Sequence, residues 1–395
     1  MSYRKLKGDH LFDGHCFLPS NKVLITDSEG KIMDITNFAD AGDEVENYKG
    51  IISPGFVNAH CHLELSHLKG IIPEKTGLID FVFKVVTLRH SEEKKIIEAI
   101  DKAEKEMLEN GIVAVGDICN NGLTVFQKLK KNLACYNFIE TSGWLPQVAS
   151  KRFDLSRFIY DEFETNNLRA SIVPHAPYSV SNDLWEKMIP YFKEKVITIH
   201  NQETKHEDEF FMEGKGDFLK MYEMMHIDNS FYQAKKMRSV ESYFQKFSTA
   251  SSVILVHNTF MQQEDINFIN THKTSKQLVS FCLCPNANLY IENALPPVNL
   301  LLENNCNIIL GTDSLASNHQ LNLLEEIKTI VKRFPQIKTE TLLQWATING
   351  AKALQMDEQL GSFEKGKTPG ILLIKNSEGG KINDASEIET LIKIK

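Results

Sequence analysis

The sequence lacks any long apolar run and any excess of positive charge. No stretch of 18 residues is uninterrupted by polar side chains, and the N-terminal segment MSYRKLKGDHLFDG has no apolar core of the kind that a secretory leader contains. The 44 Lys and Arg residues are outnumbered by 52 Asp and Glu residues, so the formal net charge is −8. Because nucleic-acid binding depends on clustered Lys and Arg, this balance argues against a nucleic-acid partner. We expect a cytoplasmic protein without a membrane segment, whose partner is a small molecule.

The sequence also lacks a disulfide framework. Its seven cysteines are an odd number, scattered from Cys16 to Cys306 without regular spacing, which favours reduced thiols. Cys282 and Cys284 form a CxC pair in SFCLCPN, but no second cysteine pair is present to complete a tetrahedral metal site. We interpret these two cysteines as buried strand residues.

The sequence does contain the regular alternation of an α/β protein. Hydrophobic residues make up 42% of the chain and charged residues 24%, as in ordinary globular proteins. After about residue 50, short β-rich runs alternate with amphipathic helical patterns, which is typical of βαβ units and a parallel sheet. We predict eight strands, at residues 55–60, 111–119, 134–140, 169–175, 196–203, 251–258, 278–284 and 307–313. Eight strand–helix units are the number that closes a barrel, so we predict a (β/α)8 TIM-like barrel over residues 53–362.

A helix is predicted between the first two strands. Within residues 91–111, apolar side chains recur at helical spacing, Ser91 stands where a cap is expected, and Gly111 follows the end. The recurring apolar residues are Ile96, Ile100, Ala103 and Met107.

Three further segments lie outside this alternation. Residues 1–52 and 363–395 both contain short β-rich stretches with turn residues, so we expect the two chain ends to form one small β-sandwich domain. Residues 204–250 form a long, charged and Met-rich insertion after the fifth strand. Long loops at the carboxyl ends of barrel strands commonly shape the substrate site.

Metal-ligand residue types gather at the ends of the predicted strands. Alternate residues of a strand point to the same face, so His60 and His62 should point together into the mouth of the barrel. Other strands also end in residues of this type, namely His175, His200, His257 and Asp313. The carboxyl ends of barrel strands are where barrel active sites lie, and this pattern therefore predicts a metal site.

The motifs at these strand ends resemble the amidohydrolase superfamily, in particular its cytosine/adenosine deaminase-like branch with one metal ion. The resemblance rests on PGFVNAHCH (54–62), HNQE (200–203), LVHN (255–258) and GTDS (311–314), in this order. The tail LGSFEKGKTPGILLI is similar to the closing strand of the family, although Thr368, Pro369 and Gly370 depart from it. The likeness covers nearly the whole chain.

The resemblance implies four metal ligands, His60, His62, His200 and Asp313. Imidazole and carboxylate suit zinc on chemical grounds as well, and the same set accepts Fe²⁺ or Mn²⁺. Relatives with two metal ions carry a carboxylated lysine at the end of the third or fourth strand, and no lysine stands there in this sequence. We therefore expect one divalent metal ion, with zinc as the first choice.

The resemblance also implies the catalytic roles. Glu203 is the proton shuttle between the attacking water and a ring nitrogen, His257 orients the water, and Asp313 protonates the departing ammonia. His175 and Asn288 contact the substrate. Asn288 lies in CPNANLYI, which matches the family pattern except for Ala287 in place of the usual serine.

Glu64 follows the His60–His62 pair by two residues, and we expect it to contact the substrate. If the strand continues past His62, Glu64 lies on the side of the metal ligands and can accept hydrogen bonds from a polar substrate edge. The run HCHLELS (60–66) is similar to that of aminodeoxyfutalosine deaminases. The resemblance thus favours deamination of an adenine-type nucleoside or related purine derivative, with aminodeoxyfutalosine first among the substrates.

A large appendage on the substrate would need further contacts. Residues 63–90 and 204–250 offer Phe81, Phe83, Lys215 and Arg238 for this, and we take Arg238 as a substrate-binding candidate. We assign His67 to the structure of its loop.

Three alternatives are weighed against this hypothesis. The same chemistry could break a C–Cl or an amide bond of a ring compound. A non-catalytic scaffold is disfavoured because the ligand set is complete, and the small zinc deaminase fold is excluded because CLCPN lacks the order and spacing of its Pro-Cys-x-x-Cys signature. Self-association into a homo-oligomer stays open.

Overall fold

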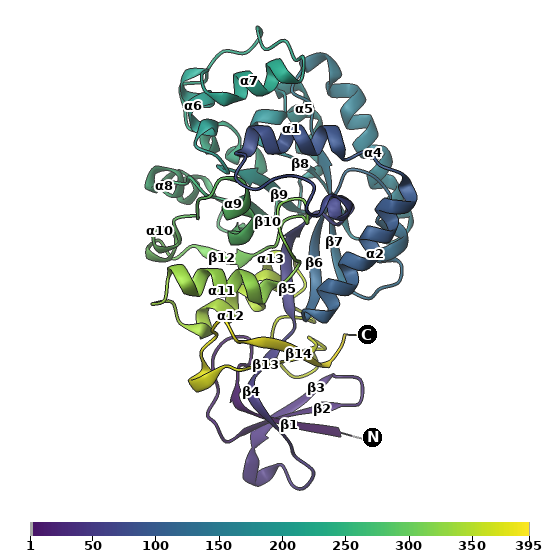
Figure 1. Cartoon of the computed structure of the whole chain (residues 1–395), viewed down its shortest axis with the longest axis vertical. Coiled ribbons are helices and arrows are strands. Elements are labelled where there is room, and N and C mark those ends of the chain that lie inside the picture. The colour runs from purple at the N-terminus through teal and green to yellow at the C-terminus, as the bar shows by residue number, and fades with distance from the viewer. Residues whose placement is uncertain (1–2, 395) are drawn as a thin grey trace.

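The structure, a computed structural model, describes residues 3–394 and contains two four-stranded parallel sheets and one six-stranded mixed sheet (Figure 1). The strands are β1 (Tyr3–Leu11), β2 (Lys22–Asp27), β3 (Ile32–Asn37), β4 (Glu46–Pro54), β5 (Phe56–Cys61), β6 (Ile112–Cys119), β7 (Ala134–Thr141), β8 (Ala170–Pro174), β9 (Val196–Asn201), β10 (Ser252–His257), β11 (Leu278–Leu283), β12 (Asn307–Leu310), β13 (Ile371–Lys375) and β14 (Glu387–Ile392).

Helices alternate with these strands. They are α1 (Leu78–Leu88), α2 (Glu93–Glu109), α3 (Val125–Lys128), α4 (Ala149–Thr165), α5 (Asn182–Met188), α6 (His206–Glu213), α7 (Asp217–Met224), α8 (Gln263–His272), α9 (Pro285–Ile291), α10 (Val298–Glu303), α11 (Leu323–Arg333), α12 (Thr339–Ala346) and α13 (Ile348–Ala353). Within residues 3–394, none of the helices has the length and apolar character that a membrane crossing requires.

The eight predicted strands correspond to β5 to β12, in the predicted order. One parallel sheet has the order β5-β6-β7-β8 and the other β12-β11-β10-β9. All residues of β5, β6, β9 and β10 are buried, as expected for parallel strands covered on both faces. The parallel α/β arrangement is therefore confirmed.

Backbone hydrogen bonds connect the two parallel sheets at both of their edges. The His200 N–H donates to the His175 carbonyl at 3.0 Å, next to the ends of β8 and β9. The Asp313 N–H donates to the His60 carbonyl at 3.1 Å, which joins the segment after β12 to β5. These contacts support the predicted closure into one barrel, which stays a prediction.

The chain ends meet in the six-stranded sheet, whose order is β14-β13-β4-β1-β2-β3. Its core combines Leu6, Leu24 and Ile52 with Leu373 from the C-terminal tail. In Figure 1 this sheet lies at one end of the molecule, and α1, α6 and α7 lie at the other end. The predicted union of the two chain ends is confirmed, whereas the division of this unit into the two layers of a sandwich stays a prediction.

The helix predicted over residues 91–111 is α2, and its apolar face is buried as expected. The prediction that Ser91 caps it is wrong, because the N-cap residue is Glu92 and no side chain caps this end. Gly111 ends the helix with a φ of 74°, and a Cβ at this position would lie 2.7 Å from Leu372 Cδ1. Glycine is thus required both by the left-handed backbone and by the close packing of the tail.

Candidate active site

Five predicted site residues converge at the carboxyl ends of the parallel strands. His60 lies on β5 and His62 directly after it, His200 lies on β9, His257 ends β10, and Asp313 follows β12. All five are buried. The strand ends therefore bring together residues that lie far apart in the sequence.

The donor atoms of this cluster are spaced as a small cation requires. Nε2 of His62 lies 3.2 Å from Nε2 of His60 and 3.3 Å from Oδ1 of Asp313, and that oxygen lies 3.6 Å from Nε2 of His60. Ligand atoms at about 2 Å from a tetrahedral zinc ion are about 3.3 Å apart. The potential ligand atoms of His60, His62 and His200 all lie within 4.8 Å of one another.

Neighbouring groups orient two of these donors. Nδ1 of His200 donates to the carbonyl oxygen of His175 at 2.8 Å, which leaves Nε2 with a free lone pair. The Ser317 hydroxyl donates to Oδ2 of Asp313 at 2.5 Å, and Oδ1 is the oxygen that faces the histidines. Such outer hydrogen bonds are typical of metal-binding histidines and carboxylates. The donor set thus fits a divalent metal ion.

Burial determines the charge of the histidines. It lowers the pKa of His62 to about 4 and that of His257 to about 3, and it lowers the pKa of His200 well below its usual range. These imidazoles are therefore neutral near pH 7, which is the form that binds metals.

Two of the site residues have a strained backbone. His257 has a φ of 73° and Asp313 a φ of 56°, and both values lie in the left-handed region that residues other than glycine seldom adopt. Strain of this kind costs on the order of 1–3 kcal/mol per residue and is concentrated at functional sites. The fold therefore holds both side chains at a cost in stability.

Glu203 lies just after β9, and its Oε1 is 3.5 Å from Nε2 of His257. Burial raises the pKa of Glu203 well above its usual range, and the negative charge of Asp313 adds to this effect. A carboxyl group with a raised pKa can both accept and release a proton near neutral pH. Chemically, Glu203 is thus suited to proton transfer.

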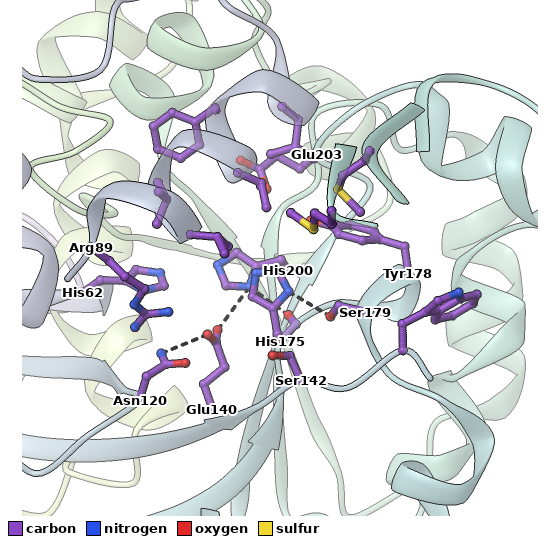
Figure 2. A pocket seen from close by; sticks show the side chains of 18 of the residues that line it. His62, Arg89, Asn120, Glu140, Ser142, His175, Tyr178, Ser179, His200 and Glu203 are labelled. Atoms are coloured by element: carbon purple, nitrogen blue, oxygen red, sulfur yellow. Dashed lines mark hydrogen bonds and ion pairs between the residues drawn. The ribbon is translucent and has the colours of Figure 1, made fainter. Parts of the chain in front are cut away.

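A cavity of about 250 Å³ opens over these residues (Figure 2). Its inner end is polar and includes His62, His175, His200, His257, Glu203 and Asp313. One further wall is polar and includes Arg89, Asn120 and Glu140, whereas side chains of α1, α7 and Trp144 form an apolar part. The site therefore joins a polar reaction centre to an apolar chamber.

The prediction that Glu64 faces the substrate needs correction. The strand ends at Cys61, and the chain turns into a 3-10 helix, η2 (Leu63–Leu68), which rotates Glu64 away from the metal ligands. The buried carboxylate accepts hydrogen bonds from Arg89 at 2.6 Å and from the Asn120 N–H at 2.9 Å. Among the described residues that line the cavity are Arg89 and Asn120, but not Glu64.

Two other predicted substrate contacts, Arg238 and Asn288, do not line the cavity, although Asn288 interacts with His257. The Arg238 guanidinium pairs with Asp208 at 2.6 Å and with the buried Asp265 at 2.5 Å, so it is engaged within the insertion. The Asn288 side-chain amide donates to the Thr259 hydroxyl. Neither Arg238 nor Asn288 is among the described residues lining the cavity, whereas His175 is.

The segments proposed to hold an appendage contribute apolar side chains for the most part. Phe81 lines the cavity as suggested, but Phe83 is not among its described lining residues, and Lys215 pairs with Glu213. The predicted loop role of His67 agrees with its contacts, because its ring nitrogens lie 3.1 Å from the carbonyl oxygens of Glu64 and Arg89. Cys282 and Cys284 are buried, as predicted.

The sequence interpretation missed Glu140 and Arg89, which both line the cavity. Glu140 could have been found, since it ends the predicted strand 134–140 at the same edge as the other site residues. Arg89 follows α1 and has no comparable sequence signal. Its place depends on its ion pair with Glu64.

Residues 51–393 match the Amidohydrolase family. A 5-methylthioadenosine/S-adenosylhomocysteine deaminase of Caldicellulosiruptor saccharolyticus is 26% identical, and the alignment covers 93% of this chain and 82% of that protein.

Solved structures share the fold. The crystal structure of Helicobacter pylori aminofutalosine deaminase in complex with methylthio-coformycin matches with a TM-score of 0.80 and 22% identity, covering 95% of this chain and 93% of that chain. An adenosine deaminase from Xanthomonas campestris with bound zinc matches with a TM-score of 0.69 and 19% identity, covering 95% and 85%. The family match spans most of the described residues and all of the converging site residues, and the chain therefore belongs to the amidohydrolase family.

Proposed function

We propose that this protein is a metal-dependent hydrolytic deaminase that converts an adenine-type nucleoside to its oxo form and releases ammonia. The observation that carries the proposal is the position of Glu203, a buried carboxyl group that lines the cavity beside the metal-donor set. The deaminases of Caldicellulosiruptor saccharolyticus and Helicobacter pylori, to which the chain is similar, support this choice of reaction.

The metal in this proposal is one divalent ion, with zinc as the first choice, held by His60, His62, His200 and Asp313. The bound zinc in the Xanthomonas campestris structure supports that choice. A metal ion held by these residues would lower the pKa of a bound water and so would supply hydroxide near neutral pH. His257, which lies 3.5 Å from Glu203, orients the attacking water.

The protons follow two routes in this proposal. Glu203 takes the first proton of the attacking water and delivers it to a ring nitrogen of the substrate. The ring carbon becomes tetrahedral, Asp313 transfers the second proton to the exocyclic amine, and ammonia leaves. His175, whose Nδ1 lies 2.9 Å from the Ser179 hydroxyl, contacts the substrate ring.

The shape of the cavity supports a nucleoside with an appendage over a free base. The apolar chamber is lined by Phe81, Val82 and Val85 of α1 and by Met221 and Tyr222 of α7, which belong to one apolar cluster. A free purine base would fill the polar end and leave these side chains without a partner, so an apolar or aromatic substituent on the sugar is favoured. Aminodeoxyfutalosine is first among the candidates, because of the HCHLELS run.

We further propose that the domains divide at residues 1–52, 53–362 and 363–395, with residues 53–362 forming a closed (β/α)8 barrel. The seven free cysteines support a location in the reducing cytoplasm.

A substrate screen tests the function. Purified protein is assayed with adenosine, methylthioadenosine, S-adenosylhomocysteine, aminodeoxyfutalosine, guanine, cytosine and pterins, and both ammonia release and the ultraviolet absorbance shift are recorded. We expect ammonia from adenine nucleosides, with the highest kcat/KM for one that carries a substituent on the sugar. No ammonia from any compound, together with release of chloride or a carboxylate from a halogenated or N-acylated ring compound, would replace the deaminase assignment with that of another hydrolase.

A further inference from the structure

Glu140 carries a carboxylate oxygen that the protein leaves without a partner. The residue lies near the end of β7 and lines the cavity, and its side chain is only 7% exposed. Asn120 donates to Oε2 at 3.0 Å, while Oε1 has no hydrogen-bond partner among the described residues. A buried acceptor without a donor is costly, so its presence in a cavity wall suggests that a ligand supplies the donor.

A second metal ion does not explain this oxygen. Glu140, His175 and His200 offer potential ligand atoms within 4.8 Å of one another. However, Nδ1 of His200, which lies 3.7 Å from Oε1 of Glu140, already donates to the carbonyl oxygen of His175. The other nitrogen of His200 belongs to the metal-donor set described above. Glu140 and His175 alone make too small a ligand set for a tightly held cation.

Arg89 lines the same cavity wall, and its positively charged guanidinium offers hydrogen-bond donors (Figure 2). One terminal nitrogen of its guanidinium donates to Glu64 at 2.6 Å, and its other nitrogens have no acceptor among the described residues. Glu64 also accepts from the N–H of Asn120, the residue whose side chain holds Glu140. Through these hydrogen bonds, Glu64 and Asn120 hold the free acceptor of Glu140 and the free donors of Arg89 on the same cavity wall.

The pairing of these charges decides which ligand group fits. Glu140 alone would suit an ammonium group, but the guanidinium beside it disfavours a cation. Arg89 alone would suit a carboxylate or a phosphate, but Glu140 disfavours an anion. A neutral group that both donates and accepts satisfies the two side chains together, as neighbouring hydroxyl groups do.

We propose that Glu140 and Arg89 form the subsite for the vicinal hydroxyl groups of the substrate's ribose. Oε1 of Glu140 accepts from a hydroxyl, and the free N–H groups of Arg89 donate to the hydroxyl oxygens. This inference rests on the proposed function and narrows its substrates from adenine-type nucleosides in general to ribonucleosides. A site built to bind hydroxyls rejects analogues that lack them, because its buried polar groups are then left unpaired.

The test combines variants of the protein with variants of the substrate. Wild type, Glu140→Gln and Glu98→Gln are assayed with adenosine, 2′-deoxyadenosine, 3′-deoxyadenosine and 2′,3′-dideoxyadenosine. Glu98 is an exposed carboxylate on α2 and is the matched control. We expect wild-type kcat/KM to fall by about 100-fold from adenosine to the dideoxy compound. Glu140→Gln should lower kcat/KM for adenosine about 10- to 100-fold, since it weakens hydrogen bonds to a charged acceptor, and should change the dideoxy value less than about threefold.

The other outcomes overturn the subsite. If Glu140→Gln lowered kcat/KM equally for all four nucleosides, the Glu140 carboxylate would affect catalysis through the neighbouring histidines and not through contacts with the sugar. Loss of bound metal in this variant would make Glu140 a ligand. If wild type deaminates adenosine but does not discriminate against the dideoxy compound, only the subsite fails. If wild type deaminates no adenine nucleoside, the proposed function fails together with it.

Discussion

Oε1 of Glu203 lies 3.5 Å from Nε2 of His257, and both side chains are almost completely buried. Burial raises the pKa of the Glu203 carboxyl group and lowers that of the His257 imidazole to about 3, so burial disfavours an ion pair of a glutamate anion with a histidine cation. Glu203 can then act as the proton carrier while His257 stays uncharged.

Glu203→Gln preserves the shape of the side chain but cannot carry the proton. We expect kcat to fall on the order of 10²–10⁴-fold, or about 3–5 kcal/mol of activation free energy, with the fold and metal content near wild type. Steady-state kinetics, circular dichroism and elemental analysis check these three quantities. A variant that keeps more than about a third of wild-type turnover would assign the proton transfer to another residue.

The metal content follows from the donor set. Protein purified without chelators should hold close to one divalent ion per chain, and His200→Ala should lose most of it because one imidazole ligand is removed. His206→Ala, on the first turn of α6, is the control and should keep its metal. Elemental analysis that finds two tightly held ions, or none, in wild type contradicts the single-ion site.

Because Arg238 forms its ion pairs within the insertion, we expect its replacement to lower the stability of the fold without changing catalysis. Arg238→Ala leaves the buried Asp265 carboxylate without its partner, so we expect the free energy of unfolding to fall by about 2 kcal/mol. The kcat/KM of the folded protein should stay within about twofold of wild type. Lys215→Ala, in an exposed pair, should change little by comparison. A large rise in KM for Arg238→Ala would restore this residue to the substrate site.

Glu207 predicts a specific pH dependence of stability. Burial raises its pKa from 4.5 to about 8, so the folded state keeps a proton that the unfolded state loses above about pH 4.5. The contribution of Glu207 to stability therefore declines as the pH rises from about 5 to 8. Relative to wild type, Glu207→Gln should gain on the order of a few kcal/mol in unfolding free energy across this range. Urea unfolding at several pH values measures the difference.

Glu213→Gln, at the exposed end of the same helix, controls for the loss of a carboxylate. Its stability should follow the wild-type pH profile. If Glu207→Gln also runs parallel to wild type, the buried carboxyl group is not protonated in the folded state.

The local pattern of side chains determined the order of the strands and much of the site. Continuous apolar runs mark strands buried on both faces, and all eight predicted runs became β5 to β12. Because the carboxyl ends of parallel strands share one edge, residues such as His60, His200 and Asp313 were brought together from positions far apart in the chain. That inference needs only the period of a strand and the direction of its neighbours.

Only the tertiary structure decided where the remaining side chains point. Glu64 points away from the metal ligands because the backbone leaves the extended conformation after His62. This turn changes only a few backbone dihedral angles, and the residue types at these positions do not predict it. Arg238 instead pairs with the buried Asp265 and the half-buried Asp208, and a buried carboxylate without such a partner is costly. Arg89 and Glu140 share a cavity wall although they come from separate segments, because Glu64 and Asn120 connect them. Such long-range pairings depend on the packed positions of whole elements, which local sequence patterns do not encode.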